Sequence, residues 1–245
     1  MILLMTAKGN EMSLYAISDL HLALGVDKPM SIFGDHWDKH SDKIALNWHD
    51  SVKHDDTVLI PGDISWGMTL DEAASDLEFI NSLPGMKIIT KGNHDYWWTT
   101  VAKIEKYFED KGFDTIKLLK NNFFRVDDDL VCGTRGWILP GDPAFSSNDP
   151  IVYRRETGRL EASLKSAEKV RKVSDRLIVM MHYPPLLSNN RSSDFTRLLS
   201  EYSADICLYG HVHLKGFSRC IEGQIDGVDY INISADKIAF KPLCV

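Results

Sequence analysis

Five short stretches of the chain place Asp, His or Asn directly after a run of apolar, strand-like residues. These stretches are Asp19-Leu20-His21, Gly62-Asp63, Gly92-Asn93-His94-Asp95, His182 and Gly210-His211-Val212-His213. Carboxylate, imidazole and amide side chains bind divalent metals, and carboxylates and imidazoles also transfer protons, so this repetition predicts a shared site. No cysteine belongs to the set. Mixed nitrogen and oxygen ligands suit Mn²⁺, Fe, Zn²⁺ or Ni²⁺ better than a structural zinc or a calcium site.

Each stretch taken alone has a simpler explanation. A Gly-Asp pair such as Gly62-Asp63, placed after the apolar run 57–60, is typical of a turn, and Asp19-x-His21 is typical of a turn with a solvated histidine. In an extended chain, however, residues two apart point to the same side, so Asp19 and His21 can act together. Ligands of open α/β sheets bind at the carboxyl ends of the strands, where all five stretches are expected to lie.

The elements that must position these residues alternate in type along the first half of the chain. Strand-like runs at 13–18, 57–60 and 87–90 alternate with helical patterns at 41–52, 69–83 and 100–111. This order predicts parallel strands joined by right-handed crossovers, so that the carboxyl ends of the strands lie along one edge. The second helix is expected to begin at a capping box formed by Thr69 and Glu72.

The second half of the chain departs from this alternation. Short strands are expected at 116–119, 123–126 and 130–133, as a separate antiparallel section whose last two strands form a hairpin. Helices at 150–173 and 193–202 then flank strands at 176–181 and 205–209, and short strands at 216–220, 227–233 and 238–240 end the chain. No stretch has the composition of an interdomain linker. We therefore expect one domain over residues 13–245, preceded by a flexible N-terminal extension over residues 1–12.

Composition excludes several classes of protein. The 245 residues carry a net charge of −7, which gives the whole protein no attraction for long nucleic acids or anionic membranes. No apolar run reaches the roughly 18 residues of a membrane span, and the apolar start is too short for a signal-peptide core. The four cysteines show no C-x-x-C spacing and are expected to be free thiols. A cytoplasmic location is the expectation.

Taken together, the five stretches resemble the calcineurin-like metallophosphoesterase superfamily. The motif order D-x-H, G-D, G-N-H-D, lone His and G-H-x-H runs here from Asp19 to His213, about four-fifths of the chain. The wider phrases P-G-D-I-S-W, G-N-H-D-Y-W-W and Y-G-H-V-H are similar to small bacterial predicted phosphohydrolases of this type. The resemblance implies an α/β fold, a four-layer α-β-β-α sandwich of two mixed β-sheets flanked by helices.

The resemblance also implies a dinuclear metal site of Mn, Fe or Zn. By motif position, one metal is bound by Asp19, His21, Asp63 and His213, and the other by Asp63, Asn93, His182 and His211. Asp63 is then the carboxylate that both metals share. The implied reaction is hydrolysis of a small phosphomonoester or phosphodiester by a metal-activated hydroxide. His94 would act as the acid or charge stabiliser, and Asp95 would help to orient it.

One departure from the family pattern bears on the substrate. The serine/threonine protein phosphatases of the superfamily extend the second motif to G-D-x-x-D-R-G, whereas Gly62-Asp63 is followed here by Ile-Ser-Trp-Gly, without an arginine. A protein phosphatase of that branch is therefore not expected. Arg135 is the first choice for a substrate-binding phosphate clamp, with Arg154 and Arg155 as alternatives.

Other interpretations stay open. A non-catalytic scaffold with this fold is the alternative function, although such a scaffold would be expected to have lost metal ligands. Four tryptophans follow motif or loop residues, and they either stiffen the loops or stack a nucleotide base. They are Trp66, Trp97, Trp98 and Trp137. The partner is thus a small phosphorylated substrate, with a nucleotide as one option.

The stretch 22–40 is expected to be a long loop that borders the site. His36 and His40 stand four apart in it, as helical metal ligands do. No third ligand is evident nearby, so a solvated polar face is the preferred interpretation of this pair.

Overall fold

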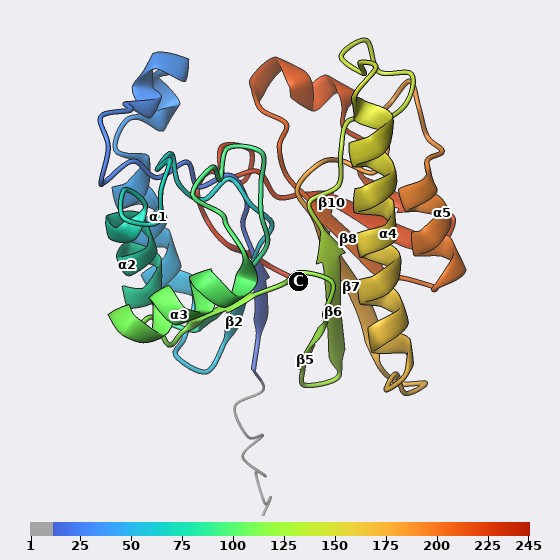
Figure 1. Ribbon diagram of the computed structural model, residues 1–245, viewed down its shortest axis with the longest axis horizontal. Helices are drawn as coiled ribbons and strands as arrows, with labels where there is room; N and C mark the ends of the chain where they lie inside the picture. Colours follow the sequence, from blue (N-terminus) through green and yellow to red (C-terminus); the bar gives the residue numbers. More distant parts are fainter. Residues whose placement is uncertain (1–11) are drawn as a thin grey trace, which may run out of the picture.

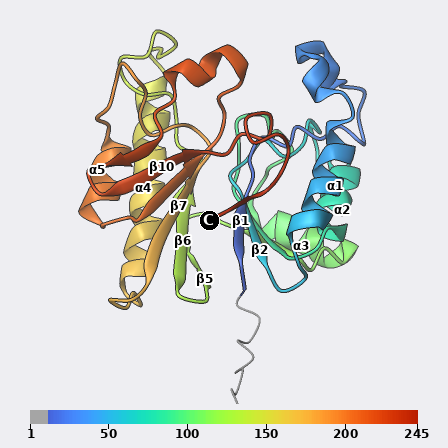
Figure 2. The same ribbon diagram turned by 180° about the vertical axis from the view of Figure 1, so that it is seen from behind.

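Two mixed β-sheets lie face to face, and helices cover the outer face of each, in a computed structural model that describes residues 12–245 (Figures 1 and 2). This arrangement confirms the predicted α/β sandwich of four layers. The extension predicted for residues 1–12 lies, apart from Met12, outside the described residues.

The first sheet is built from the β-α alternation of the N-terminal half. Its spatial order is β11 (Leu243–Cys244), β1 (Leu14–Ala16), β2 (Thr57–Ile60), β3 (Met86–Ile89) and β4 (Ile116–Leu118). Strands β1 to β4 are parallel, as predicted, and β11 pairs antiparallel with β1 at the edge. The helices between these strands are α1 (His40–Ser51), α2 (Ala74–Ser82) and α3 (Val101–Lys111).

The second sheet is built from the C-terminal half. Its spatial order is β5 (Phe124–Val126), β6 (Asp129–Thr134), β7 (Arg176–Met181), β8 (Ile206–Tyr209), β10 (Val228–Asn232) and β9 (Gly223–Ile225). The four central strands are parallel, and the two edge strands are antiparallel to their neighbours. Helices α4 (Asp149–Glu168) and α5 (Asp194–Glu201) lie on its outer face (Figure 1).

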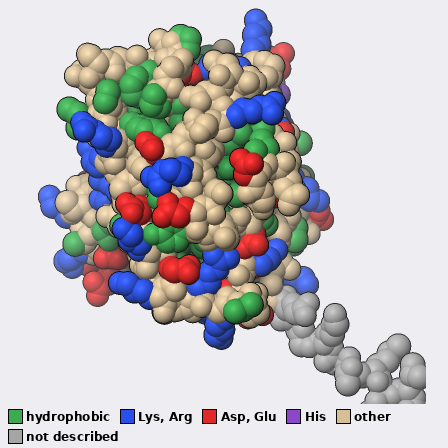
Figure 3. Space-filling model, turned by 90° about the vertical axis from the view of Figure 1, so that its right-hand side faces the viewer, with side chains coloured by type: hydrophobic (Ala, Val, Ile, Leu, Met, Phe, Trp, Pro, Cys, Tyr) green, Lys and Arg blue, Asp and Glu red, His purple; other side chains and the backbone are tan. Residues whose placement is uncertain are grey.

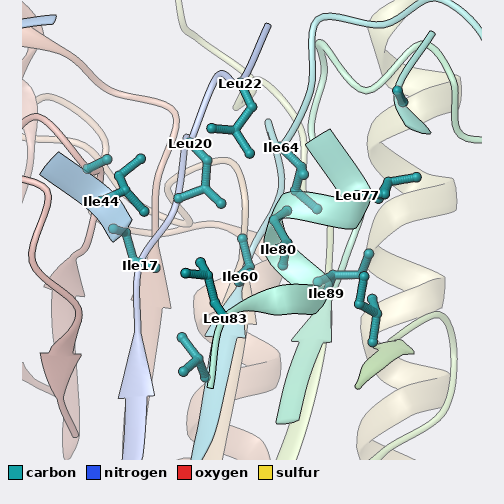
Figure 4. Packing of buried hydrophobic residues seen from close by; sticks show 14 of the residues in the cluster. Ile17, Leu20, Leu22, Ile44, Ile60, Ile64, Leu77, Ile80, Leu83 and Ile89 are labelled. Carbon is teal, nitrogen blue, oxygen red and sulfur yellow. The ribbon is translucent and has the colours of Figure 1, made fainter. Parts of the chain in front are cut away.

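Alternation along the strands explains the four layers. In β7, Leu177 and Val179 pack in the cluster that includes residues of α4 and α5, whereas Ile178 and Met180 pack in the cluster between the sheets. Successive strand side chains point to opposite faces, so a strand that is apolar at every position fills two cores at once. The third cluster joins the first sheet to α1 and α2, where Ile60 packs near helix residues (Figure 4).

Four sequence predictions about elements were wrong. The stretch 216–220 falls largely within a 3-10 helix, Leu214–Arg219, and 238–240 is a turn in which Ala239 and Phe240 have positive φ. The helix expected from residue 69 begins at Ala74, because Thr69 and Glu72 form their capping contacts around a preceding turn. The expected antiparallel section is divided, since β4 runs parallel to β3 in the first sheet.

The face covered by α4 and α5 shows Lys and Arg interspersed with Asp and Glu (Figure 3). Within residues 12–245 no helix is both long enough and apolar enough to cross a membrane. The four cysteines are free thiols, as predicted.

Candidate metal centre

All nine predicted metal-binding and catalytic side chains lie in the loops that follow β1, β2, β3, β7 and β8. Backbone hydrogen bonds hold the first two of these loops together. The Asp19 N–H donates to the Gly62 carbonyl at 3.1 Å, and the His21 N–H donates to the Asp63 carbonyl at 2.9 Å. Parallel strand order thus places residues from distant parts of the sequence at one edge.

The structure brings six of these residues into two compact groups of potential metal ligands. The groups are Asp19, His21 and His213, and Asp63, His182 and His211. Within each group, the ligand atoms all lie within 4.8 Å of one another. Imidazole nitrogen and carboxylate oxygen in such groups can bind a transition metal.

Asp63 lies between the two groups. Its Oδ2 atom is 3.8 Å from His21 Nε2 of the first group and 3.5 Å from His182 Nε2 of its own. Burial, followed by the carboxylates of Asp19 and Asp95, raises the pKa of Asp63 well above its usual value. A buried carboxylate that has carboxylate neighbours and no Lys or Arg ion pair among the described residues favours a bound cation.

The arrangement around His182 fits a cation especially well. Its Nδ1 lies 3.1 Å from the Pro61 carbonyl, which can only accept a hydrogen bond, so Nδ1 carries the proton and Nε2 has the lone pair. Nε2 is 2.6 Å from Asn93 Oδ1 and 3.2 Å from His211 Nδ1. A lone pair facing an amide oxygen is repulsive unless a cation lies between them. Asn93 therefore lies beside the second group with an oxygen that could serve as a neutral ligand.

Asp236 holds the first group in place, and sequence reasoning missed it. Asp236 Oδ1 is 2.8 Å from His213 Nδ1, while His213 Nε2 lies 3.7 Å from Asp19 Oδ1. A carboxylate on one ring nitrogen orients the other nitrogen toward a metal. Burial lowers the pKa of His213, but the hydrogen bond to Asp236 and the charge of Asp19 more than offset this, and the net shift is upward. The only sequence signal was an acidic residue shortly after β10.

The other imidazoles of the centre are neutral at pH 7. Burial lowers the pKa of His21 and His182 well below the usual value, and that of His211 to about 3. Burial also raises the pKa of Asp19 to about 6. These shifts penalise charge in a buried site, and neutral imidazole is the form of histidine that binds metal.

Backbone conformation at the ligands is unusual. Four of them have positive φ, a region that non-glycine residues seldom adopt: Asp19 (59°), His21 (45°), Asp63 (51°) and His211 (70°). Such conformations cost of order 1–3 kcal/mol each and cluster at functional sites.

Two glycines next to ligands are required by close approach. A Cβ atom at Gly92 would collide with the Asp63 carboxylate and backbone, and one at Gly210 would collide with the Asp19 carboxylate. This explains why glycine precedes Asn93 and His211 in their motifs.

His94 borders a cavity of about 200 Å³ together with His21, Asp63, His211 and His213. Its Nδ1 is buried and lacks a hydrogen-bond partner among residues 12–245. Burial, then the positive charge of Lys28, lowers the pKa of His94. The imidazole is therefore mostly neutral at pH 7, and it keeps one N–H to donate.

Lys28 is a second residue that sequence reasoning missed. Its ammonium lies 4.0 Å from the Trp66 ring centroid, and Trp66 in turn packs 4.4 Å from the His94 ring. Lys28 therefore brings a positive charge next to Trp66, which lines the cavity, from the stretch that we expected to border the site.

Asp95 organises the loops rather than contacting the His94 ring. Its carboxylate accepts five hydrogen bonds, from the N–H groups of Asp63, Ile64, Ser65 and Gly92 and from Trp97 Nε1. Among the described residues, no hydrogen bond joins this carboxylate to the His94 imidazole. The loop after β2 is thereby fastened to the loop after β3.

Arg135 does not line the cavity that His94 borders. Its Nη2 is 3.3 Å from Glu156 Oε1, and its guanidinium stacks 4.3 Å from the Trp137 ring centroid. Trp137 lines a further cavity of about 320 Å³ that also reaches His211 and His213. Of the four tryptophans named from the sequence, Trp97 and Trp98 are buried, whereas Trp66 and Trp137 line the two cavities that reach His211 and His213.

The chain is similar to known proteins in its family motifs and in its fold. The profile of the family described as calcineurin-like phosphoesterase matches residues 12–215. The phosphopantetheinyl hydrolase PptH of Mycobacterium tuberculosis shares the fold at a TM-score of 0.59 and 14% identity, over 97% of both chains. The protein AQ665 of Aquifex aeolicus, of unknown function, does so at 0.50 and 18%, over 95% of both.

A curated phage protein matches over a shorter stretch. The Gene 66 protein of Mycobacterium phage L5 is 40% identical over 80 residues, which is 32% of this chain and 37% of the phage protein. The match therefore spans well under half of that relative.

Proposed function

Because the chain belongs to the calcineurin-like phosphoesterase family, we propose that it is a dinuclear-metal enzyme that hydrolyses a small phosphomonoester or phosphodiester. The observation that supports this most strongly is the position of Asp63 Oδ2, within 4 Å of an imidazole nitrogen from each ligand group. Two cations close together repel each other unless an anion lies between them. Asp63 is the residue that can supply it.

The ligand residues set the charge of the centre. When bound, two divalent metals would lower the pKa of a water to about 7 and neutralise charge on phosphate oxygens. Asp19 and Asp63 offset part of the metal charge, while the four imidazole ligands, which bind metal in the neutral form, and Asn93 offset none. The site thus keeps a positive excess, which an acidic protein needs in order to hold a phosphate anion.

In this proposal, His94 acts on the leaving group of the substrate. The Nδ1 atom of its ring is buried and has no hydrogen-bond partner within residues 12–245. Trp66 packs against the ring, and the His94 backbone N–H donates to Asp63 Oδ1 at 2.7 Å. A neutral imidazole N–H can donate to a phosphate or leaving-group oxygen. His94 therefore stabilises developing charge and gives up a proton to the leaving alkoxide.

The two cavities beside the centre limit the size of the substrate. His211 and His213 line both cavities. Trp66 lines the cavity of about 200 Å³, and Trp137 lines the cavity of about 320 Å³. Aromatic walls can stack a base, so a nucleotide is part of the proposal. A location in the cytoplasm stays a prediction.

Two variants test the proposal by separating metal binding from turnover. Asp63→Ala should lose at least one metal ion per chain by elemental analysis. His94→Ala should keep both ions and lower kcat for 4-nitrophenyl phosphate by about 10²–10⁴-fold. If His94→Ala emptied the site, the division between ligands and acid would be wrong. If the wild type held metal but hydrolysed no ester, a non-catalytic scaffold would be favoured instead.

A further inference from the structure

A third cavity, of about 240 Å³, lies at the carboxyl ends of β3, β4 and β6 and against α4. Five cationic side chains and one carboxylate line it: Lys91, Lys120, Arg135, Arg155, Arg159 and Glu156. None of the five cations belongs to the ligand groups of the metal centre. In a chain with a net charge of −7, so many positive side chains around one small cavity need an explanation.

Three of the cations converge on Glu156, which is fully buried. Its Oε1 lies 2.7 Å from Arg159, 3.3 Å from Arg135 and 3.5 Å from Arg155. Its Oε2 also accepts a hydrogen bond from Thr134 Oγ1 at 2.9 Å. One carboxylate neutralises one guanidinium, so neutralising Glu156 would require one arginine and not three.

The two lysines have no such partner. Within residues 12–245, neither Lys91 nor Lys120 forms an ion pair, and the Nε atom of Arg135 is buried without a hydrogen-bond acceptor. Burial and then the positive charge of Arg159 lower the pKa of Lys120. The cavity therefore holds an excess of positive charge and unused donors.

We propose that this cavity is a second anion site, which binds a phosphate group beside the metal centre. Guanidinium and ammonium groups together provide the charge-assisted donors that phosphate oxygens accept. The cavity adjoins the metal centre through two loops. Lys91 directly precedes the loop that carries Asn93, and the Arg135 carbonyl accepts a hydrogen bond from the N–H of Tyr183, the residue after His182.

The bound phosphate has two potential sources. It is either a second phosphate of the substrate or a separate phosphate ion that binds independently. A phosphate from either source would bind to the same donors. In either case Arg135, which was expected to clamp phosphate by itself, acts as one member of a cationic cluster.

Calorimetry with inorganic phosphate tests the site on the Mn²⁺-loaded protein. We expect a binding event that Lys120→Gln and Arg155→Gln each weaken by at least about tenfold, the loss of one charge-assisted contact. Lys117→Gln is the matched control, because Lys117 is exposed on the same strand β4 and removes the same charge. Circular dichroism confirms folding of each variant. Equal phosphate affinity in all four proteins would overturn the proposal.

Kinetics distinguish the two sources. Adenosine 3′,5′-bisphosphate and adenosine 5′-monophosphate differ by one phosphate. If that phosphate occupies the cavity, Lys120→Gln lowers the kcat/KM of the bisphosphate, relative to that of the monophosphate, by about tenfold. If this ratio is unchanged while the variant binds inorganic phosphate more weakly, the site binds a separate phosphate ion. The calorimetric arm needs no turnover, so failure to hydrolyse either nucleotide counts against the proposed function and leaves the anion site to be decided by binding.

Discussion

Single side chains decide whether the ligand groups are ready to bind metal. The candidate ligands could be named from sequence, because each is an Asp, His or Asn placed directly after a strand. Asp236 and Lys28 could not, because neither follows a motif, and their contacts with His213 and Trp66 exist only after distant loops have been brought together. Which residues orient the ligands therefore depends on the tertiary structure.

Asp236→Asn tests this orienting role. The variant removes the negative charge 2.8 Å from His213 Nδ1 but keeps the shape of the side chain. We expect metal affinity to fall by about 10–100-fold, with little change in folding. Competition with a fluorescent chelator measures the affinity. Asp114→Asn, an exposed change of the same charge, should leave affinity unaltered, and equal affinities in the two variants would refute the role.

At the level of elements, the loops after the strands are held in costly conformations by neighbouring backbone. The strand ends could be predicted from apolar runs and Pro-Gly punctuation. The positive φ values of Asp19, Asp63 and His211 could not, since nothing in the residue types announces them. Asp95 secures a close contact between the β2 and β3 loops, and this contact leaves room only for glycine at Gly92.

Gly92→Ala and Gly158→Ala should therefore have opposite effects. A Cβ at Gly92 meets the Asp63 carboxylate and backbone, so this variant should lose stability and metal. A Cβ at Gly158, inside α4, meets nothing within 4 Å, so this variant should gain about 0.5–1 kcal/mol of unfolding free energy. Urea unfolding and metal analysis measure both. A Gly92→Ala protein that binds metal normally would contradict the packing argument.

The buried Lys87 ammonium, which binds carbonyls just after α2, should make stability depend on pH. The ammonium donates to the carbonyls of Leu83, at 2.6 Å, and Gly85, at 2.7 Å. Burial lowers its pKa from 10.5 to about 8. Between these values the unfolded chain binds more protons than the folded one, so the stability of the wild type rises with pH.

The comparison is with Lys87→Met, which cannot titrate. From pH 7.5 to pH 10, the unfolding free energy of the wild type should rise by about 2 kcal/mol relative to the variant. Urea unfolding at both pH values measures it. A difference between the two proteins that is independent of pH would show that the ammonium is not destabilised by burial.

On the scale of the whole molecule, two sheets place their ligand loops along one edge. The β-α alternation of the first half predicted the parallel strands of the first sheet. The presence of a second sheet was expected only from the motif resemblance. The C-terminal strands were the poorest prediction, because short edge strands are decided by tertiary contacts. Phe240, expected in a strand, instead turns with positive φ and packs 5.1 Å from the Trp37 ring.

The central claim is that this edge holds two metals that work together on a phosphate ester. Stepwise addition of Mn²⁺ to metal-free protein, with binding and hydrolysis of 4-nitrophenyl phosphate and bis(4-nitrophenyl) phosphate followed together, tests it most directly. The account predicts two bound ions per chain and turnover of at least one ester that reaches its plateau only at the second equivalent. Absence of stoichiometric binding, or full occupancy without hydrolysis of either ester, would contradict it.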